Sequence, residues 1–370
     1  MFRPSSRWRR ALSLLAGAVV LVLTAAPGLL AGAGGGADAG AVAPQPPGTP
    51  TPQAPGIQLV QRKFDMPDPY VLDVKGKYYM YLSSMIYNRN QNVPLFVGSP
   101  GHWASKTVEA VPKMPSWAAT DPDKGGLSWS PEVHKIDGTF VMYFAPTILN
   151  SLPVQHCIAL ATSSSPAGPF TVQPNPFLCQ RSLGGDIDAG LFVDKNGPDG
   201  PAHPNYLIWK SDNNSTPGDG PPHIWAQPLS NDGRHLVGQA VDIYTPEQAW
   251  QDNLIEAPQM ALSPDGTVWV FFSAGAGYNT ANYGMGVVHC ISPLGPCSGG
   301  DSKPILTSNQ QGPGPGEETY FTASDGSYWL LYSPWYTGDP IAPFRPVEAA
   351  RIGWIPVGPY LAAAGTFPKP

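Results

Sequence analysis

The sequence predicts an all-β protein, a five-bladed β-propeller, on three observations. A phrase that reads as strand, Gly-containing turn and strand returns five times, with starts about 60 residues apart. Third strands recur behind these hairpins, and no helical periodicity of useful length lies between them. Repeated sheets of three or four strands close around an axis, which leaves few open sheet edges. The phrases begin at Asp68, Ser130, Asp188, Glu256 and Glu318.

The second strand of each phrase is the clearest, because aromatic and β-branched residues cluster in it. These strands are expected at residues 77–84, 139–146, 205–211, 267–274 and 327–334. Each follows a Gly, an Asp-Gly pair or a longer Gly/Pro loop, which predicts a hairpin with the strand before it. Third strands are expected within segments 158–172, 223–233 and 286–297. Segment 346–365 is expected to supply an outer strand or, alternatively, to complete the first blade.

The composition fits a large core with many turns. Of the 370 residues, 42% are hydrophobic and only 13% are charged, against about 25% charged in typical soluble domains. The 41 Gly and 45 Pro residues supply the turns that many short strands require. The net charge is −6 and no basic stripe follows residue 10, so no nucleic-acid partner is predicted.

The N-terminal part of the chain differs from the rest. Residues 1–35 join a basic start to an apolar run with small residues at its end, which predicts a signal peptide. Residues 36–57 are rich in Pro, Gly, Ala and Thr, which predicts a disordered linker before a propeller domain at 58–370. We expect a secreted monomer with no stable membrane insertion after cleavage. Because the apolar run is long, an uncleaved anchor is the alternative.

Four Cys residues fit an exported protein, and three pairings are open in principle. Pairing of Cys157 with Cys179 and of Cys290 with Cys297 is favoured, since each disulfide would clip neighbouring strands of one repeat. Free buried thiols are the alternative.

Carboxylates recur where the first strands of the phrases begin. In a propeller these positions point to one end of the central channel, so Asp68, Asp188 and Glu256 are predicted to share one pocket. Like charges brought together cost stability, so the cluster indicates a function. Taken singly, Asp68 and Asp188 could be ordinary turn residues. Glu256 lies between apolar residues at a strand start, where turn chemistry does not explain it.

Paired carboxylates without a metal motif favour glycoside hydrolysis. One carboxylic acid protonates the leaving oxygen, and one carboxylate activates a water molecule. A gap of roughly 6.5–9.5 Å between them leaves room for that water and gives inversion. A third carboxylate nearby would keep the acid protonated near neutral pH.

From about Phe64 to Tyr360 the motifs resemble those of glycoside hydrolase family 43, five-bladed propeller enzymes that act on arabinofuranosides and xylosides. DPYVLDVKGKYYMY resembles the first-blade motif, which implies that Asp68 is the general base. IDAGLFVDKNG resembles the third-blade motif, which implies that Asp188 tunes the pKa of the acid and orients it. IEAPQM resembles the fourth-blade motif, which implies that Glu256 is the general acid.

The resemblance extends to substrate contacts and shows one departure. SWSPEVHKIDGTFVMYF resembles the second-blade motif, in which Trp129 is a candidate platform for sugar stacking and Phe144 a further substrate contact. Many members carry a His at the start of the fifth-blade motif, near a metal ion or water, whereas this chain has Glu317 and Glu318. Glu318 fits the register better and is predicted to contact substrate. No organic cofactor or metal-ligand set is implied, although a carboxylate could hold Ca²⁺ in the central channel.

The expected function is inverting hydrolysis of an arabinofuranose-containing polysaccharide or oligosaccharide by an arabinofuranosidase or arabinanase. The wording Trp-Ser-Pro-Glu and Ile-Glu-Ala-Pro favours this over a β-xylosidase, which stays an alternative. A propeller that binds carbohydrate without hydrolysis and a retaining propeller enzyme acting on fructans are the other two alternatives.

Overall fold

The computed structural model describes part of the chain. The described residues are 57–58, 65–84, 91–99, 102–104, 107–121, 126–194, 205–216, 220–300, 302–308, 312–335 and 344–363. The chain divides into two units, residues 1–49 and 50–370, and every described residue lies in the second. The predicted signal peptide, and the predicted linker except Ile57, lie outside the described residues. Within the described ranges, no helix has the length and apolar character needed to cross a bilayer.

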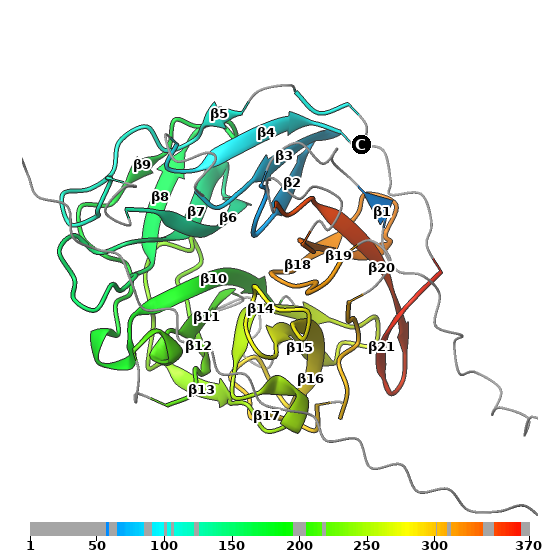
Figure 1. Cartoon of the computed structure of the whole chain (residues 1–370). Helices are drawn as coiled ribbons and strands as arrows, with labels where there is room; N and C mark the ends of the chain where they lie inside the picture. Colours follow the sequence, from blue (N-terminus) through cyan, green and yellow to red (C-terminus); the bar gives the residue numbers. More distant parts are fainter. Residues whose placement is uncertain are drawn as a thin grey trace, which may run out of the picture. The chain divides into compact units, whose positions relative to one another are not determined.

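Five antiparallel sheets stand in a ring, which confirms the predicted five-bladed propeller (Figure 1). The first two blades consist of β2 (Tyr70–Val74), β3 (Lys77–Tyr81), β4 (Pro94–Gly98) and β5 (Val108–Glu109), then β6 (Ser128–Ile136), β7 (Thr139–Pro146), β8 (Ala159–Ser163) and β9 (Thr171–Val172). The third and fourth consist of β10 (Asp186–Val193), β11 (Asn205–Ser211), β12 (Ile224–Pro228) and β13 (Val241–Tyr244), then β14 (Ile255–Leu262), β15 (Val268–Ala274), β16 (Gly284–Cys290) and β17 (Cys297–Ser298).

The fifth blade also takes a strand from the N-terminal side of the chain. It consists of β18 (Thr319–Thr322), β19 (Tyr328–Tyr332), β20 (Glu348–Ile355), β21 (Gly358–Leu361) and β1 (Ile57–Gln58). β1 pairs with the start of β20, and β21 pairs with the end of the same strand. The C-terminal segment therefore belongs to the last blade and does not complete the first. Loops of the described ranges hold the short 3₁₀ helices η2 (Arg181–Leu183), η4 (Asn213–Ser215) and η5 (Ala249–Gln251).

The predicted hairpins form where the sequence places glycine. Gly76, Gly138, Gly266 and Gly326 follow the first strands of four blades with φ between 79° and 86°. Only glycine adopts this left-handed backbone without steric cost, so these residues set the turns. In the first hairpin the Gly76 N–H also donates to Oδ1 of Asp73 at 2.9 Å.

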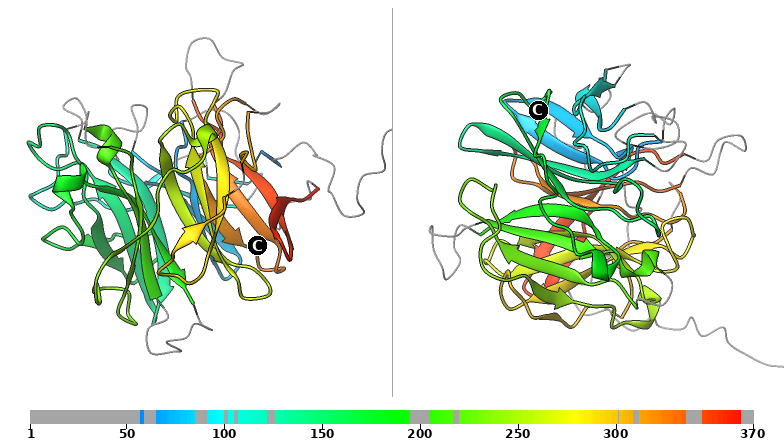
Figure 2. Two further views of the ribbon diagram at one scale, coloured as in Figure 1. Left: turned by 90° about the horizontal axis from the view of Figure 1, so that it is seen from below. Right: turned by 90° about the vertical axis from the view of Figure 1, so that its left-hand side faces the viewer.

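The core lies between neighbouring blades, which stand side by side around the axis (Figure 2). Between the third and fourth blades, for example, Phe192 and Ile208 pack with Val270 and Phe272. Each blade is thus covered on both faces, so its second strand is apolar along nearly its whole length; in β7 every residue after the first is buried. This double burial explains the small share of charged residues.

Both predicted disulfides are present. Cys157 pairs with Cys179 beside β8, and Cys290 pairs with Cys297 across β16 and β17. Each one closes a loop inside a single blade, where it limits the freedom of the unfolded chain.

Candidate active site

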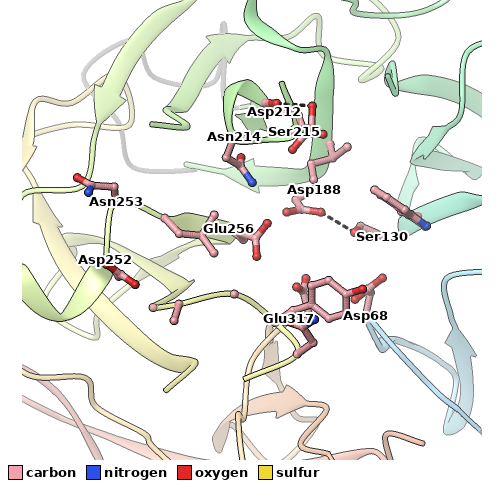
Figure 3. Close-up of a pocket in the computed structure, with 18 of the residues that line it drawn as sticks. Asp68, Ser130, Asp188, Asp212, Asn214, Ser215, Asp252, Asn253, Glu256 and Glu317 are labelled. Carbon is pink, nitrogen blue, oxygen red and sulfur yellow. Dashed lines mark hydrogen bonds between the residues drawn. The ribbon is translucent and has the colours of Figure 1, made fainter. Parts of the chain in front are cut away.

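A pocket of about 500 Å³ lies where the first strands of all five blades begin. Its volume falls within the range of small-molecule sites. The carboxyl groups of Asp68, Asp188, Glu256 and Glu317 converge in this pocket (Figure 3). Loops contribute further wall positions, at Asp212, Asn214 and Ser215 and at residues 252–254 and 275–279. Side chains that are far apart in the sequence thus line one pocket large enough for a sugar.

At or next to the start of its first strand, each blade has a non-glycine residue in the left-handed backbone region. The residues are Asp68 (φ 53°), Ser130 (φ 47°), Asp188 (φ 57°), Ala257 (φ 48°) and Glu317 (φ 56°). Such a backbone is uncommon outside glycine and costs energy, so the surrounding structure must hold it in place. Its recurrence in every blade marks one structural position that repeats around the axis.

β-Bulges at the same level break the alternation of side chains along the first strands. The pairing register shifts between Trp129 and Glu132 in β6, between Ile187 and Gly190 in β10, and between Glu256 and Gln259 in β14. Asp188 is itself the left-handed residue of its blade, whereas Glu256 immediately precedes the left-handed Ala257. Glu256 therefore enters the pocket from a position one residue earlier than the repeat register predicts.

The fifth blade differs from the predicted register in a similar way. Glu317 has the left-handed backbone and lines the pocket, whereas Glu318 follows it and does not. Glu318 is 2% exposed and faces a smaller cavity deeper in the channel, where its Oε2 accepts a hydrogen bond from Ser273. The structural equivalent of Asp68 is therefore Glu317.

Asp68 is half-buried at the entrance of the first blade and lines both cavities. The Ser83 hydroxyl donates to its Oδ2 and accepts from the Ser130 N–H at 2.7 Å, which ties the first blade to the second. Desolvation raises the pKa of Asp68, while the Arg345 guanidinium and the Ser83 hydrogen bond oppose that rise.

Asp188 is buried at the start of β10 and connects three blades through hydrogen bonds. Its Oδ1 accepts from the Ser130 hydroxyl at 2.6 Å, and its Oδ2 accepts from the Ala257 N–H at 2.9 Å. Because Ala257 follows Glu256, Asp188 fixes the backbone that carries the Glu256 side chain. Burial raises the pKa of Asp188 to about 7, against the opposing charge of the Lys210 ammonium.

Glu256 is held between a cation and a phenol. Lys210, fully buried in β11, donates from Nζ to Glu256 Oε1 at 2.7 Å and to Asp212 Oδ1 at 3.0 Å. The Tyr283 hydroxyl lies 3.0 Å from Glu256 Oε2. Burial alone would lower the pKa of Lys210, but the neighbouring carboxylates of Glu256, Asp212 and Asp188 raise it above its ordinary value.

Glu317 joins Asp68, Asp188 and Glu256 as a further carboxyl group that lines the pocket. Its Oε1 lies 3.0 Å from the same Tyr283 hydroxyl that contacts Glu256. Desolvation, followed by the charges of Asp68, Asp188 and Glu256, raises the pKa of Glu317 well above its ordinary value. No three His, Cys, Asp or Glu side chains in the described part of the chain are grouped as metal ligands.

The model of glycosyl hydrolases family 43 matches residues 61–354. The chain belongs to this family. It is thus a glycoside hydrolase by family, and the resemblance of its sequence motifs is confirmed.

Solved structures of similar fold include several enzymes of this kind. A thermostable family-43 glycoside hydrolase is 25% identical, with a TM-score of 0.68 over 83% of this chain and 96% of that chain. An α-L-arabinofuranosidase from Lactobacillus brevis is 22% identical, with a TM-score of 0.63 over 81% of this chain and 94% of that chain. An exo-1,5-α-L-arabinanase from a bovine ruminal metagenomic library is 18% identical, with a TM-score of 0.60 over 82% of this chain and the whole of that chain. The last two likenesses show the fold alone.

One curated relative of this family 43 chain matches by sequence over a shorter range. A β-D-galactofuranosidase from Aspergillus niger is 28% identical over 184 residues, which are 49% of this chain and 47% of that protein. The chain thus matches about half the length of that relative.

The family 43 site brings together four of the residues predicted from the sequence. Asp68, Asp188, Glu256 and Trp129 all line the pocket. The Trp129 indole stacks on the His156 ring with centroids 3.8 Å apart. This stack fixes the indole at the pocket wall.

Two predicted substrate contacts lie elsewhere and are corrected. Phe144 is fully buried in the core with Val133 and Met142, because β7 runs inside its blade and is covered on both faces. Glu318 faces the smaller cavity, because the left-handed residue that turns into the pocket is Glu317.

Three basic or phenolic side chains of the family 43 site were not predicted. Lys210 had a visible signal, since it is a single cation directly after the apolar run YLIW of its strand. Arg345 lines the pocket and donates from Nε to Asp65 Oδ1 at 3.2 Å, but it lies outside the repeated phrases. Tyr283 likewise lies outside them, so the sequence offered no signal for it.

Proposed function

We propose that this family 43 chain is a secreted, inverting hydrolase of arabinofuranose-containing polysaccharides or oligosaccharides. The observation that carries the proposal is the convergence of Asp68, Asp188 and Glu256 in one sugar-sized pocket. Three carboxyl groups in different environments match the division of labour that inverting hydrolysis requires.

In the proposed mechanism Asp68 is the general base. It would take a proton from the attacking water, and its hydrogen bond from Ser83 orients the carboxylate. Glu256 is the general acid and would protonate the departing glycosidic oxygen. Asp188 positions this acid, because it accepts a hydrogen bond from the Ala257 N–H in the backbone that carries Glu256.

The Lys210 ammonium has a separate task in this scheme. It donates to Oε1 of Glu256 and so leaves Oε2 as the oxygen on which the acid carries its proton. Trp129 offers a flat wall against which one face of a sugar ring can stack.

A furanose substrate is supported by the solved relative described as an arabinofuranosidase and by the relative described as a galactofuranosidase. β-D-Galactofuranose is therefore a second candidate for the sugar that this pocket accepts. A β-xyloside stays a third candidate, since xylosidases occur among the structural relatives.

Secretion rests on the basic and apolar segment in residues 1–35. The two disulfides fit an oxidising compartment. N-terminal sequencing of the exported protein tests this part: a mature chain that starts near residue 36 is expected, and a retained segment would favour the anchor.

The main test compares release of p-nitrophenol from α-L-arabinofuranoside, β-D-galactofuranoside and β-D-xyloside. Release from the arabinofuranoside is expected to be fastest, and proton NMR of the first-formed sugar should show the inverted anomer. Retention of configuration would favour the fructan-type alternative. Binding to arabinan without release of reducing sugar would favour a carbohydrate-binding propeller.

A further inference from the structure

The Tyr283 hydroxyl has two carboxyl neighbours and only one proton. Its oxygen lies 3.0 Å from Glu256 Oε2 and 3.0 Å from Glu317 Oε1. An ionised carboxylate only accepts hydrogen bonds, so one phenol proton cannot satisfy both contacts. Both contacts are hydrogen bonds only when one of the two carboxyl groups carries a proton and donates it to the phenol oxygen.

The oxygen of Glu256 that meets Tyr283 is also the one free to carry a proton. Glu256 Oε1 accepts from the Lys210 ammonium at 2.7 Å, which leaves Oε2 for the acidic hydrogen. The phenol thus contacts the oxygen from which an acid would act.

The position of the Tyr283 ring is fixed by its surroundings. The side chain is 1% exposed. A Cβ atom at Gly316 would lie 2.1 Å from the ring, so the backbone just before Glu317 packs directly against it. The close approach that glycine allows holds the phenol and the Glu317 carboxyl in register.

We propose that Glu256, Tyr283 and Glu317 form one hydrogen-bonded chain that shares a single exchangeable proton, with Glu317 as its store. The inference rests on the proposed role of Glu256 as general acid. Glu317 and Tyr283 are positioning residues in this scheme, because they act on the substrate only through Glu256.

The proton transfer balances in two linked steps. As the glycosidic oxygen begins to depart, the Tyr283 hydroxyl passes its proton to Glu256 Oε2 and the Glu317 carboxyl passes the stored proton to the phenol oxygen, so Tyr283 stays neutral and Glu317 becomes ionised. Glu256 then gives the proton it has received to the leaving oxygen. Glu317 then recovers a proton from pocket water, which in turn receives the one that Asp68 took from the attacking water.

The charges around the chain favour a stored proton on Glu317. Three sets of charged groups face this chain of side chains. Glu256 is faced by Lys210 and Asp188. Glu317 is faced by Asp68, Asp188 and Arg345, and Tyr283 is faced by Glu318. The cation nearest to Glu256 is in direct hydrogen-bond contact with it, whereas carboxylates outnumber cations around Glu317. Desolvation and these carboxylates raise the pKa of Glu317 well above its ordinary value.

Glu317→Gln and Tyr283→Phe test the chain, with Tyr143→Phe as the matched control. Tyr143 is an equally buried phenol that donates to the Gly233 carbonyl at 2.6 Å, and it does not line the pocket. Both test variants should move the alkaline limb of kcat/KM to lower pH by about one unit for a poor leaving group. The double variant should lose no more activity than the more impaired of the two single variants. With a dinitrophenyl leaving group, the variants should show no such loss of activity. The control should keep the wild-type pH profile.

An infrared measurement tests the same inference without relying on turnover. In difference spectra in D₂O near neutral pH, Glu317→Gln should remove one protonated-carboxyl stretching band and Tyr283→Phe should shift it, whereas the band of Glu318, whose pKa burial raises to about 8, should stay in both variants. If the wild-type enzyme cleaves no furanoside but shows this band, the proposed function fails and the shared proton stands. A missing band, an unmoved alkaline limb, or losses in the two variants that add independently of pH would overturn the inference.

Discussion

The two ends of the first strands place the same kind of side chain in opposite environments. At the pocket end, burial raises the pKa of Asp188 to about 7 and that of Glu318 to about 8. At the hairpin end, Asp265 is exposed, and hydrogen bonds from Ser263 and Thr267 lower its pKa. The position of an acidic residue along the strand, and not the carboxyl group itself, therefore decides whether its ionised form stabilises or destabilises this fold.

The largest expected effect comes from the pocket end. Glu256→Gln should lower kcat on a substrate with a poor leaving group by about 10²–10⁴-fold, because the proposed acid can no longer donate. The measurement is steady-state kinetics on an arabino-oligosaccharide. Asp325→Asn in an exposed hairpin is the matched control and should keep wild-type kinetics. Near-full activity of Glu256→Gln would show that another group is the acid.

Removing the buried cation should have the next largest effect, now on stability. Lys210→Met leaves Glu256, Asp212 and Asp188 without their shared ammonium, which should cost about 3–5 kcal/mol in the free energy of unfolding. Urea unfolding at neutral pH measures it. Lys135→Met, at an exposed cation over the Phe140 ring, is the control and should cost about 1 kcal/mol or less. Equal stability of the two variants would contradict the role of Lys210.

A smaller effect should appear in the pH dependence of stability. The folded-state pKa of Asp188 is raised from 3.8 to about 7, so the native protein binds the extra proton between these values. The contribution of this proton binding to the free energy of unfolding is therefore fully present below pH 3.8 and is lost as pH rises to about 7. Unfolding free energies between these two pH values should fall less steeply in Asp188→Asn than in the wild type. An identical slope in both proteins would show that Asp188 does not titrate in this range.

The smallest effect, of opposite sign, is expected at the hairpin end. The folded-state pKa of Asp265 lies below 3.8, so its contribution is present above that value and is lost as pH falls. Asp265→Asn should therefore lower stability slightly at neutral pH and leave it unchanged in strong acid. Thermal unfolding at the two pH values measures the difference. A stabilised variant at neutral pH would contradict the contrast between the two strand ends.

The sequence was sufficient for the blades because their signals are local. Glycine turns such as Asp-Gly at Asp137 and Gly138, and the aromatic strands behind them, define each hairpin without reference to distant residues. The convergence of Asp68, Asp188 and Glu256 followed from the ring itself. These parts of the fold and site were therefore predictable from one chain.

The remainder depended on backbone geometry that a repeat register does not encode. Bulges and left-handed residues decide whether Glu317 or Glu318 turns into the pocket, and the sequence Glu-Glu reads the same in either case. Phe144 and Lys210 both lie in second strands, yet one packs in the core and the other reaches an acid. Which of them meets the pocket depends on the neighbouring blades and not on local pattern.

The pairing of β1 with β20 closes the ring of blades, because it joins a strand that precedes the first blade to the last blade. Two residue pairs, Ile57 with Ala349 and Gln58 with Glu348, form this closure, whereas β19 and β20 are joined by five residue pairs. A shortened chain that started at Asp65 would bare the backbone of β20 at this seam. An open strand edge of that kind can recruit the same segment from another copy, so trimming the chain for crystallisation or fusion should spare residues 57–58.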